Sequence, residues 1–259
     1  MNAIAIISIC CYLASTFSIV RHFQQHAQRP ALYIAWTAVI AHSSYIALSF
    51  EPSVSFNIFS TGSIIAMIVA LLLLLAALNK PVEKLGLAVF PIAALMLALA
   101  VNFADTPHLL HIYNWQMTTH ILTSIIAFSL LNIAAVQAIL LAIQDQQLKS
   151  HPPKRFIQSL PPLQTMETLL FQMIAVGVFF LSISLISGFI FVENLFAQHL
   201  VHKTVLSILA WFIFTGLLFG RIRYGWRGQP AIQWTLIGFV SLLLAYFGSK
   251  MVLELILHR

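Results

Sequence analysis

The residues of this sequence that could do chemistry in apolar surroundings are histidines. The chain has ten, and four fall in or beside long apolar stretches: His42, His120, His199 and His202. An imidazole in such a place ligates haem iron or another transition metal, carries protons, or lies at a membrane surface. His199 and His202 are three residues apart and would share a helix face, with Lys203 four residues after His199.

Motifs for other chemistries are missing from the sequence. It has no phosphate-binding loop, no dinucleotide-binding glycine pattern and no nucleophile elbow, and we expect no enzymatic turnover. Cys10 and Cys11 are adjacent, which favours apolar packing over a redox or metal motif. A zinc or two-metal site would need cysteine or carboxylate ligands close to the histidines. Haem needs only one or two imidazoles and a broad apolar slot, so haem is the preferred occupant.

The composition indicates which elements must position these histidines. Apolar residues make up 60% of the 259 residues and charged residues 8%, against roughly 25% charged in soluble domains. Apolar stretches of about 20 residues span a bilayer as helices. We predict spans at 3–21, 31–50, 58–78, 84–102, 118–144, 166–192, 199–220 and 231–256. The predicted fold is all-α, a polytopic membrane bundle of about eight transmembrane helices in a single membrane domain, 1–259.

Basic residues in the loops predict the orientation of the bundle. Ten of the thirteen follow the odd-numbered spans: Arg21, Arg29, Lys80, Lys84, Lys149, Lys154, Arg155, Arg221, Arg223 and Arg227. Loops rich in lysine and arginine face the cytoplasm, so both termini are expected on the outer, periplasmic side. The four histidines then lie near the outer ends of their helices. Nucleic-acid binding is not expected, because it needs one concentrated basic face.

Three loops carry further expectations. The outer segment 103–117 is expected to lie at the membrane surface, with Tyr113 and Trp115 as aromatic anchors. The cytoplasmic loop 145–165 holds two Pro-Pro pairs, which break helices, and is expected to be an extended connector. This loop and the loop 221–230 are the candidate contact sites for membrane or cytoplasmic proteins.

Three stretches of sequence resemble a known family. The run HLVHKTVLSILAWFIFTGLLFGRIRYGWRGQPAIQWTLIGFVSLLLAYFGS, residues 199–249, resembles the end of the cytochrome c assembly family, which includes CcsA-type and HemX-type proteins. The run MTTHILTSIIAFSLLNIAAVQAILLAI resembles the family helix that carries a haem-associated histidine, here His120. The phrase LPPLQTMETLLFQM is similar to the YpjD-type inner-membrane branch. The resemblance is strongest over 118–256.

The resemblance implies a membrane haem-binding or haem-handling protein of the bacterial inner membrane, with haem b as its cofactor. His120 would be the first axial ligand, His42 or His202 the opposite one, and Lys203 a partner for a haem propionate. The tryptophan-rich outer segment of the family reads QHLVHKTVLS here, so haem ligation to an apocytochrome is not implied.

Two alternatives to haem handling stay open. One is a membrane regulator or scaffold without haem, acting through the loops 145–165 and 221–230. The other is a transporter for a small solute or metal ion, which would use the few charged residues near the ends of the spans: Glu167, Lys250 and Glu254.

Overall fold

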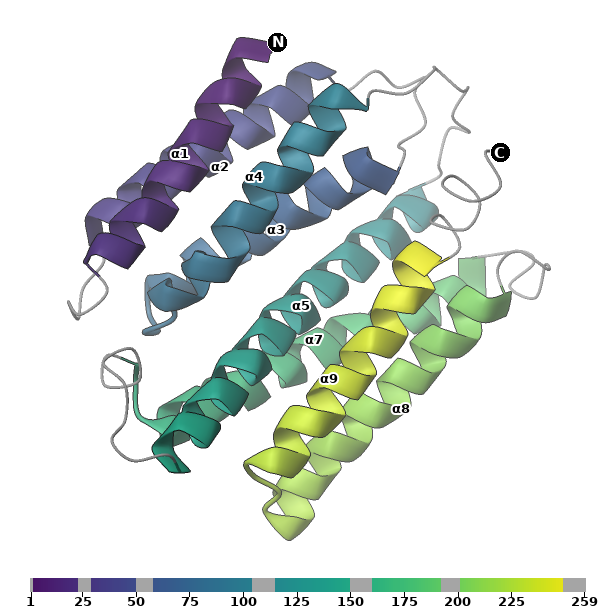
Figure 1. The fold of residues 1–259 in the computed structure, drawn as a ribbon. Coiled ribbons are helices and arrows are strands. Elements are labelled where there is room, and N and C mark those ends of the chain that lie inside the picture. The colour runs from purple at the N-terminus through teal and green to yellow at the C-terminus, as the bar shows by residue number, and fades with distance from the viewer. Residues whose placement is uncertain are drawn as a thin grey trace. The chain divides into compact units, whose positions relative to one another are not determined.

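The described residues form helices joined by short turns. The computed structural model describes residues 2–22, 29–49, 58–103, 115–149, 160–191 and 201–248. The helices are α1 (Asn2–Arg21), α2 (Arg29–Ser49), α3 (Ile58–Ala77), α4 (Gly86–Asn102), α5 (Trp115–Lys149), α7 (Leu163–Phe191), α8 (Val201–Tyr224) and α9 (Gln229–Leu243), with the short turns η1 (Glu83–Leu85) and η2 (Leu244–Gly248) (Figure 1). Among these residues, eight helices are long and apolar enough to cross a membrane. The predicted polytopic helix bundle is confirmed.

Several helices continue past the apolar stretches that predicted them. α5 has 35 residues, more than the about 20 that the hydrocarbon of a bilayer requires. Its last turns are held by an ion pair, because the Lys149 ammonium lies 2.8 Å from the Asp145 carboxylate one turn earlier. The predicted connector 145–165 is therefore wrong over 145–149 and 163–165, which are helical.

The other predicted loops have different outcomes. α8 continues to Tyr224 and α9 begins at Gln229, so the predicted loop 221–230 is shorter than expected. In the predicted outer segment 103–117, Trp115 begins α5, whereas residues 104–114 lie outside the described residues. The same holds for 150–159 of the connector and for the part of the last predicted span after residue 248.

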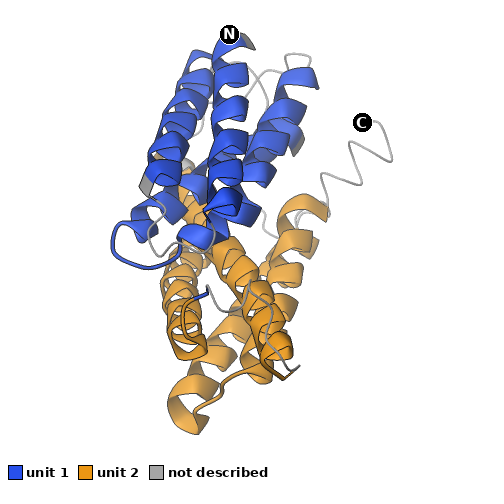
Figure 2. Cartoon of the chain, turned by 60° about the vertical axis from the view of Figure 1, so that its left-hand side comes forward, with its two compact units in different colours: residues 1–112, 154–160 blue, residues 113–153, 161–259 orange. Residues whose placement is uncertain are grey.

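The first compact unit contains residues 1–112 and 154–160 (Figure 2). Its four helices close into a ring, because α1 and α3 each pack against both α2 and α4. Fully buried alanines one and two turns apart on α2, such as Ala31 and Ala38, face α1. Ser15 on α1 donates a hydrogen bond to the Ala31 carbonyl oxygen, and Ser8 donates one to the Ala38 carbonyl oxygen, at 2.8 Å each. Small residues and hydroxyl groups of this kind let membrane helices approach closely.

The second compact unit contains residues 113–153 and 161–259. Its ring has the same order, because α5 and α8 each pack against both α7 and α9. α5 and α7 are its two longest helices. A Cβ atom added at Gly177 of α7 would lie 2.8 Å from the Leu131 side chain of α5. The glycine therefore lets an α5 leucine pack directly on the α7 backbone. The prediction of a single domain over 1–259 stays a prediction.

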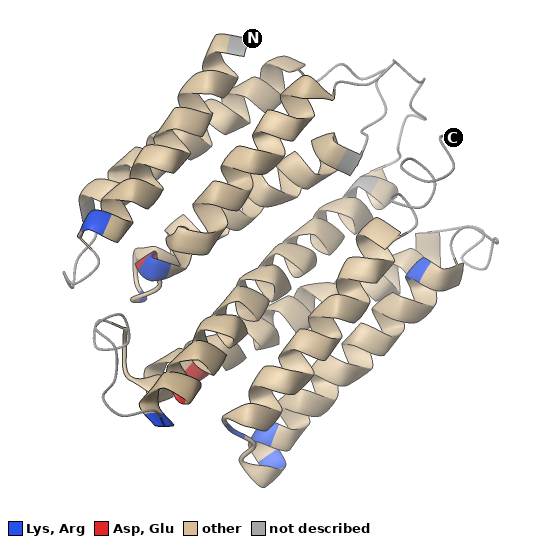
Figure 3. Ribbon diagram, in the orientation of Figure 1, with Lys and Arg blue, Asp and Glu red and all other residues tan. Residues whose placement is uncertain are grey.

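Charged side chains lie at the ends of helices (Figure 3). In the first unit, Arg21 ends α1, and Lys84 lies in the turn before α4. In the second unit, basic residues end α5 and α8, as at Lys149 and Arg221. Lys203 is the exception, because it lies in the first turn of α8. Within each unit, most of the described basic residues thus gather at one end, as the positive-inside rule requires.

Candidate functional site

His120 lies on α5 and is held by the backbone of α7. Its Nδ1 atom lies 2.9 Å from the Ser184 carbonyl oxygen and 3.2 Å from the Ser187 hydroxyl oxygen. A carbonyl oxygen only accepts, so Nδ1 must carry the hydrogen. The Ser187 hydroxyl donates its own hydrogen to the same carbonyl at 2.9 Å, which leaves the Ser187 oxygen free to accept. The α7 helix thereby fixes the tautomer of the ring.

The Nε2 atom of His120 is the chemically available one. Among the described residues, none forms a hydrogen bond with it. With Nδ1 protonated, a neutral ring carries its lone pair on Nε2. Histidines that ligate metals usually donate the hydrogen of their other nitrogen to a carbonyl or carboxylate, which orients the ring. His120 has this arrangement, and it is half-buried on the side of α7.

Gly188 of α7 makes room for the His120 ring. A Cβ atom at this position would lie 3.0 Å from the Cε1 atom of the ring and 3.4 Å from its Nδ1 atom. The distance to Cε1 is shorter than an ordinary van der Waals contact. The missing side chain therefore allows the imidazole to lie against the α7 backbone, where its hydrogen bonds with Ser184 and Ser187 are made.

A hydroxyl network supports the His120 turn from inside the unit. Ser124 donates a hydrogen bond to the His120 carbonyl oxygen at 2.7 Å. The Ser184 hydroxyl is hydrogen-bonded to the Ser124 oxygen. Because Ser124 uses its single hydrogen on the His120 carbonyl, the Ser184 hydroxyl is the donor. The network joins α5 and α7.

An aromatic cluster lies two turns along α5 from His120. The ring of Phe128 is 1% exposed, and its centroid lies 4.6 Å from that of Tyr246. Phe239 and Phe247 approach the same ring at 5.9 and 5.8 Å. Two of these aromatic residues belong to η2, a π-helical turn, and such turns are frequent at functional sites. The aromatic cluster therefore lies about 12 Å further along α5 than His120, whose ring is hydrogen-bonded to serines of α7.

His42 has a different environment, in the core of the first unit. Its side chain is fully buried, Nδ1 lies 3.3 Å from the Tyr12 hydroxyl, and Nε2 lies 2.8 Å from the Ser63 hydroxyl. A neutral imidazole has one donor and one acceptor nitrogen, so one of these two hydroxyls donates to the ring and the other accepts from it. Both nitrogens of His42 are therefore occupied, whereas Nε2 of His120 has no partner among the described residues.

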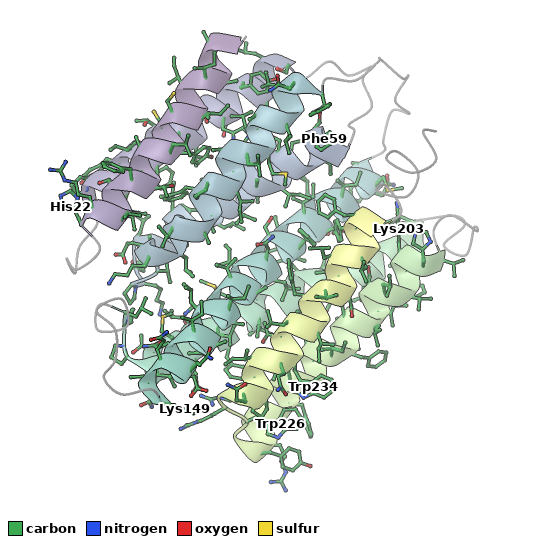
Figure 4. The ribbon with its side chains drawn as sticks, in the orientation of Figure 1. His22, Phe59, Lys149, Lys203, Trp226 and Trp234 are labelled. Atoms are coloured by element: carbon green, nitrogen blue, oxygen red, sulfur yellow. The ribbon has the colours of Figure 1, made fainter. Side chains whose placement is uncertain are left out.

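The remaining predicted site residues lie in the first turn of α8. His202 is exposed and Lys203 is half-buried. Figure 4 shows Lys203 at the end of the second unit where α8 begins and α9 ends. α5, with His120 in its second turn, begins at this same end, which we call the His120 end. The structure thus brings His120, His202 and Lys203 to one end of the second unit, while His42 belongs to the first unit. His199 lies outside the described residues.

The charged candidates of the transporter alternative are partly described. Glu167 of α7 is 4% exposed, and its Oε1 atom accepts a hydrogen bond of 2.6 Å from the Gly228 N–H, just before α9. A carboxylate there satisfies a free N–H group and interacts favourably with the positive end of the helix dipole. Lys250 and Glu254 lie outside the described residues.

Sequence reasoning found His120 but missed the residues that hold it. Ser184, Ser187 and Gly188 lie more than 60 residues further along the chain. Their only sequence signal is a group of small and hydroxyl residues in an otherwise apolar helix. Tyr12 was missed in the same way, because it lies 30 residues before His42. The helices are apolar on most sides, so their pattern does not indicate which face meets which neighbour.

A polytopic membrane bundle with a histidine held at one helix end is the class of protein that the structure defines. The family model described as "Cytochrome C assembly protein" matches residues 26–257. The chain belongs to this family.

Individual relatives agree with this assignment. The inner membrane protein YpjD of Escherichia coli K12 is 31% identical over 264 aligned positions, covering 99% of this chain and 100% of YpjD. The cytochrome c biogenesis protein CcsA of Chlamydomonas reinhardtii is 27% identical over 54% of this chain and 39% of its own length. Protein HemX of Brevibacillus brevis is 23% identical over 51% of this chain and 49% of its own. No solved structure matches the chain.

Proposed function

We propose that the protein binds and handles haem b in the bacterial inner membrane, as an assembly factor without turnover of its own. The observation that carries the proposal is the His120 ring, which has Nδ1 hydrogen-bonded to a backbone carbonyl and Nε2 without a partner among the described residues. Membership of the cytochrome c assembly family supports haem as the occupant. Haem b is the type proposed because the sequence has no CxxCH motif for covalent attachment.

The residues at the His120 end fit a haem group in chemistry. Nε2 of His120 would ligate the iron, and the carbonyl on Nδ1 would raise the basicity of the ring. His202 is proposed as the opposite ligand, because it lies at the same end of the second unit. The Lys203 ammonium would pair with a propionate. His42 is the weaker candidate, because ligation would break its hydrogen bond to Tyr12 or Ser63.

The test is the absorption spectrum of the protein made with ample haem. We expect a Soret band, a pyridine haemochrome of the b type, and loss or a shift of the band in His120→Ala. A matched control is His22→Ala, which removes a half-buried histidine directly after the end of α1. Wild-type protein without a Soret band would rule the proposal out.

A membrane scaffold is the second candidate, and one observation favours it. At the end of α8, Ile222 is 86% exposed and Tyr224 is 67% exposed, and the exposed Arg223 lies between them. Exposed aromatic, aliphatic and arginine side chains together are common at protein interfaces. The scaffold predicts that Ile222→Asp abolishes the cellular phenotype while His120→Ala does not. Deletion strains complemented with each variant separate the two functions.

A further inference from the structure

Two aromatic rings form a pair at the His120 end of the second unit. The ring centroids of Trp115 on α5 and Phe191 on α7 lie 6.3 Å apart, with the ring planes tilted by 58°. Trp115 is 72% exposed and Phe191 is 39% exposed. We call these two residues the aromatic pair. Their rings present a large apolar and polarisable surface that the described residues do not cover.

The aromatic pair lies directly beyond His120 along the interface of α5 and α7. Phe191 follows Gly188 by three residues, so it lies on the α7 face that meets the His120 ring. Trp115 contacts Phe191 and is five residues before His120. From the end inward, the interface therefore presents the aromatic pair first and then the open Nε2 atom.

An enclosed hydrogen-bond acceptor lies between these two layers. Gln116 is four residues before His120 and shares its helix face. The side-chain oxygen of Gln116 is inaccessible to solvent and has no hydrogen-bond donor among the described residues. Buried polar atoms are nearly always satisfied. A donor brought by a ligand or by water would meet this need, which makes the end of the interface a place built for an occupant.

We propose that the aromatic pair packs against the macrocycle of a tetrapyrrole, one ring by its face and the other by its edge because the two planes are tilted by 58°, and that the site therefore also binds metal-free porphyrins. The inference rests on the proposed haem function and divides recognition of the ligand into two parts. Face-to-face and edge-to-face contacts between aromatic systems need no metal. Ligation by Nε2 of His120 depends on the iron. A metal-free porphyrin would keep the first interaction and lose the second.

The experiment uses the full chain in lipid nanodiscs, titrated with metal-free protoporphyrin IX and, separately, with haem. Porphyrin fluorescence anisotropy reports binding, and empty nanodiscs give the background of lipid partitioning. We expect binding above background, about tenfold weaker in Trp115→Ala and in Phe191→Ala. Trp115→Phe should keep most of the affinity, because it retains a ring. The matched control is Trp234→Ala on α9, where the side chain is 41% exposed and lies toward the other end of the unit (Figure 4).

The outcomes separate this inference from the proposed function. Equal affinity in wild type, Trp115→Ala and Phe191→Ala would overturn the inference, as would wild-type binding no stronger than that of empty nanodiscs. His120→Ala is expected to retain metal-free porphyrin while changing the Soret band of bound haem. Weaker binding of metal-free porphyrin in Trp115→Ala, together with the same Soret band of haem in His120→Ala and wild type, is a further outcome. That result would support the role of the aromatic pair and refute ligation of the iron by His120.

Discussion

At the scale of single residues, His120 and His42 show how partners decide what a histidine can do. Both lie in membrane helices and both have a hydrogen bond on Nδ1. The Nε2 atom of His42 is bonded to Ser63, whereas that of His120 has no partner among the described residues. The first arrangement stabilises a core, and the second leaves a lone pair for a ligand. Two predictions follow from this contrast.

The first prediction concerns Gly188. In Gly188→Ala, the new methyl group would lie 3.0 Å from Cε1 of His120 and would push the ring away from the Ser184 carbonyl. Loss of such a supporting hydrogen bond lowers metal affinity by about 10–100-fold. Alanine also favours the helix by about 0.8–1 kcal/mol, so stability should not fall with haem affinity. Haem titration in detergent measures the haem affinity of the variant, and thermal unfolding in detergent measures its stability.

The control for Gly188→Ala is a glycine of the same unit with open space around it. Gly216 on α8 has no atom within 4 Å of the position of an added Cβ. Gly216→Ala should therefore leave haem affinity unchanged. Equal haem affinity in Gly188→Ala and wild type would contradict the placement of the ligand on His120.

The second prediction concerns His42. His42→Ala leaves the Tyr12 and Ser63 hydroxyls without partners and opens a cavity, which should cost about 2–4 kcal/mol of stability. The side-chain amide of His42→Gln has both a donor and an acceptor for the Tyr12 and Ser63 hydroxyls, so this variant should recover part of the loss. The Soret band should be unchanged in His42→Gln. A changed band in His42→Gln would instead identify His42 as the second axial ligand.

At the scale of elements, the start of α9 is held by side chains of other helices. Glu167 of α7 accepts from the Gly228 N–H, and Gln229 donates to Asp145 of α5 at 2.8 Å. The N-cap residue of α9 is Gly228, which has no side chain that could cap the helix. The Glu167 carboxylate therefore takes over the capping role, whereas the Gln229–Asp145 hydrogen bond joins two side chains and ties the start of α9 to α5.

The third prediction tests this cap. Glu167→Ala should destabilise the second unit by about 1–2 kcal/mol, whereas Glu167→Gln, which keeps an acceptor but loses the charge, should cost less. Thermal unfolding in a mild detergent shows which of the two variants is the less stable. A transporter that needs the charge of Glu167 would show the opposite pattern in vesicles, with solute flux lost in Glu167→Gln as fully as in Glu167→Ala.

At the scale of the whole molecule, the sequence predicted the eight helices but not their contacts. The spans were predictable because stretches of about 20 apolar residues have few alternatives to a membrane helix. Helix ends such as 145–149 were missed because polar residues continue a helix beyond the hydrocarbon. Ser184, Gly188 and Tyr12 were missed because they meet the histidines only after packing. His120 itself was found because an imidazole is rare in an apolar stretch.

The fourth prediction concerns orientation. Because ten basic residues lie in four alternate loops, we expect both termini on the periplasmic side and those loops in the cytoplasm. Alkaline phosphatase fused after Arg259 should be active, and green fluorescent protein inserted after Arg227 should fluoresce. The reverse pattern in the two fusions would show that the predicted orientation is wrong.

The ring order shared by the two units has a consequence for how such a chain can grow. In each unit the first and third helices pack against both the second and the fourth. A four-helix unit crosses the membrane four times, so its chain leaves on the side where it entered. A second four-helix unit joined to its end therefore enters the membrane in the same direction as the first. The insertion machinery would then read the same charge signals twice.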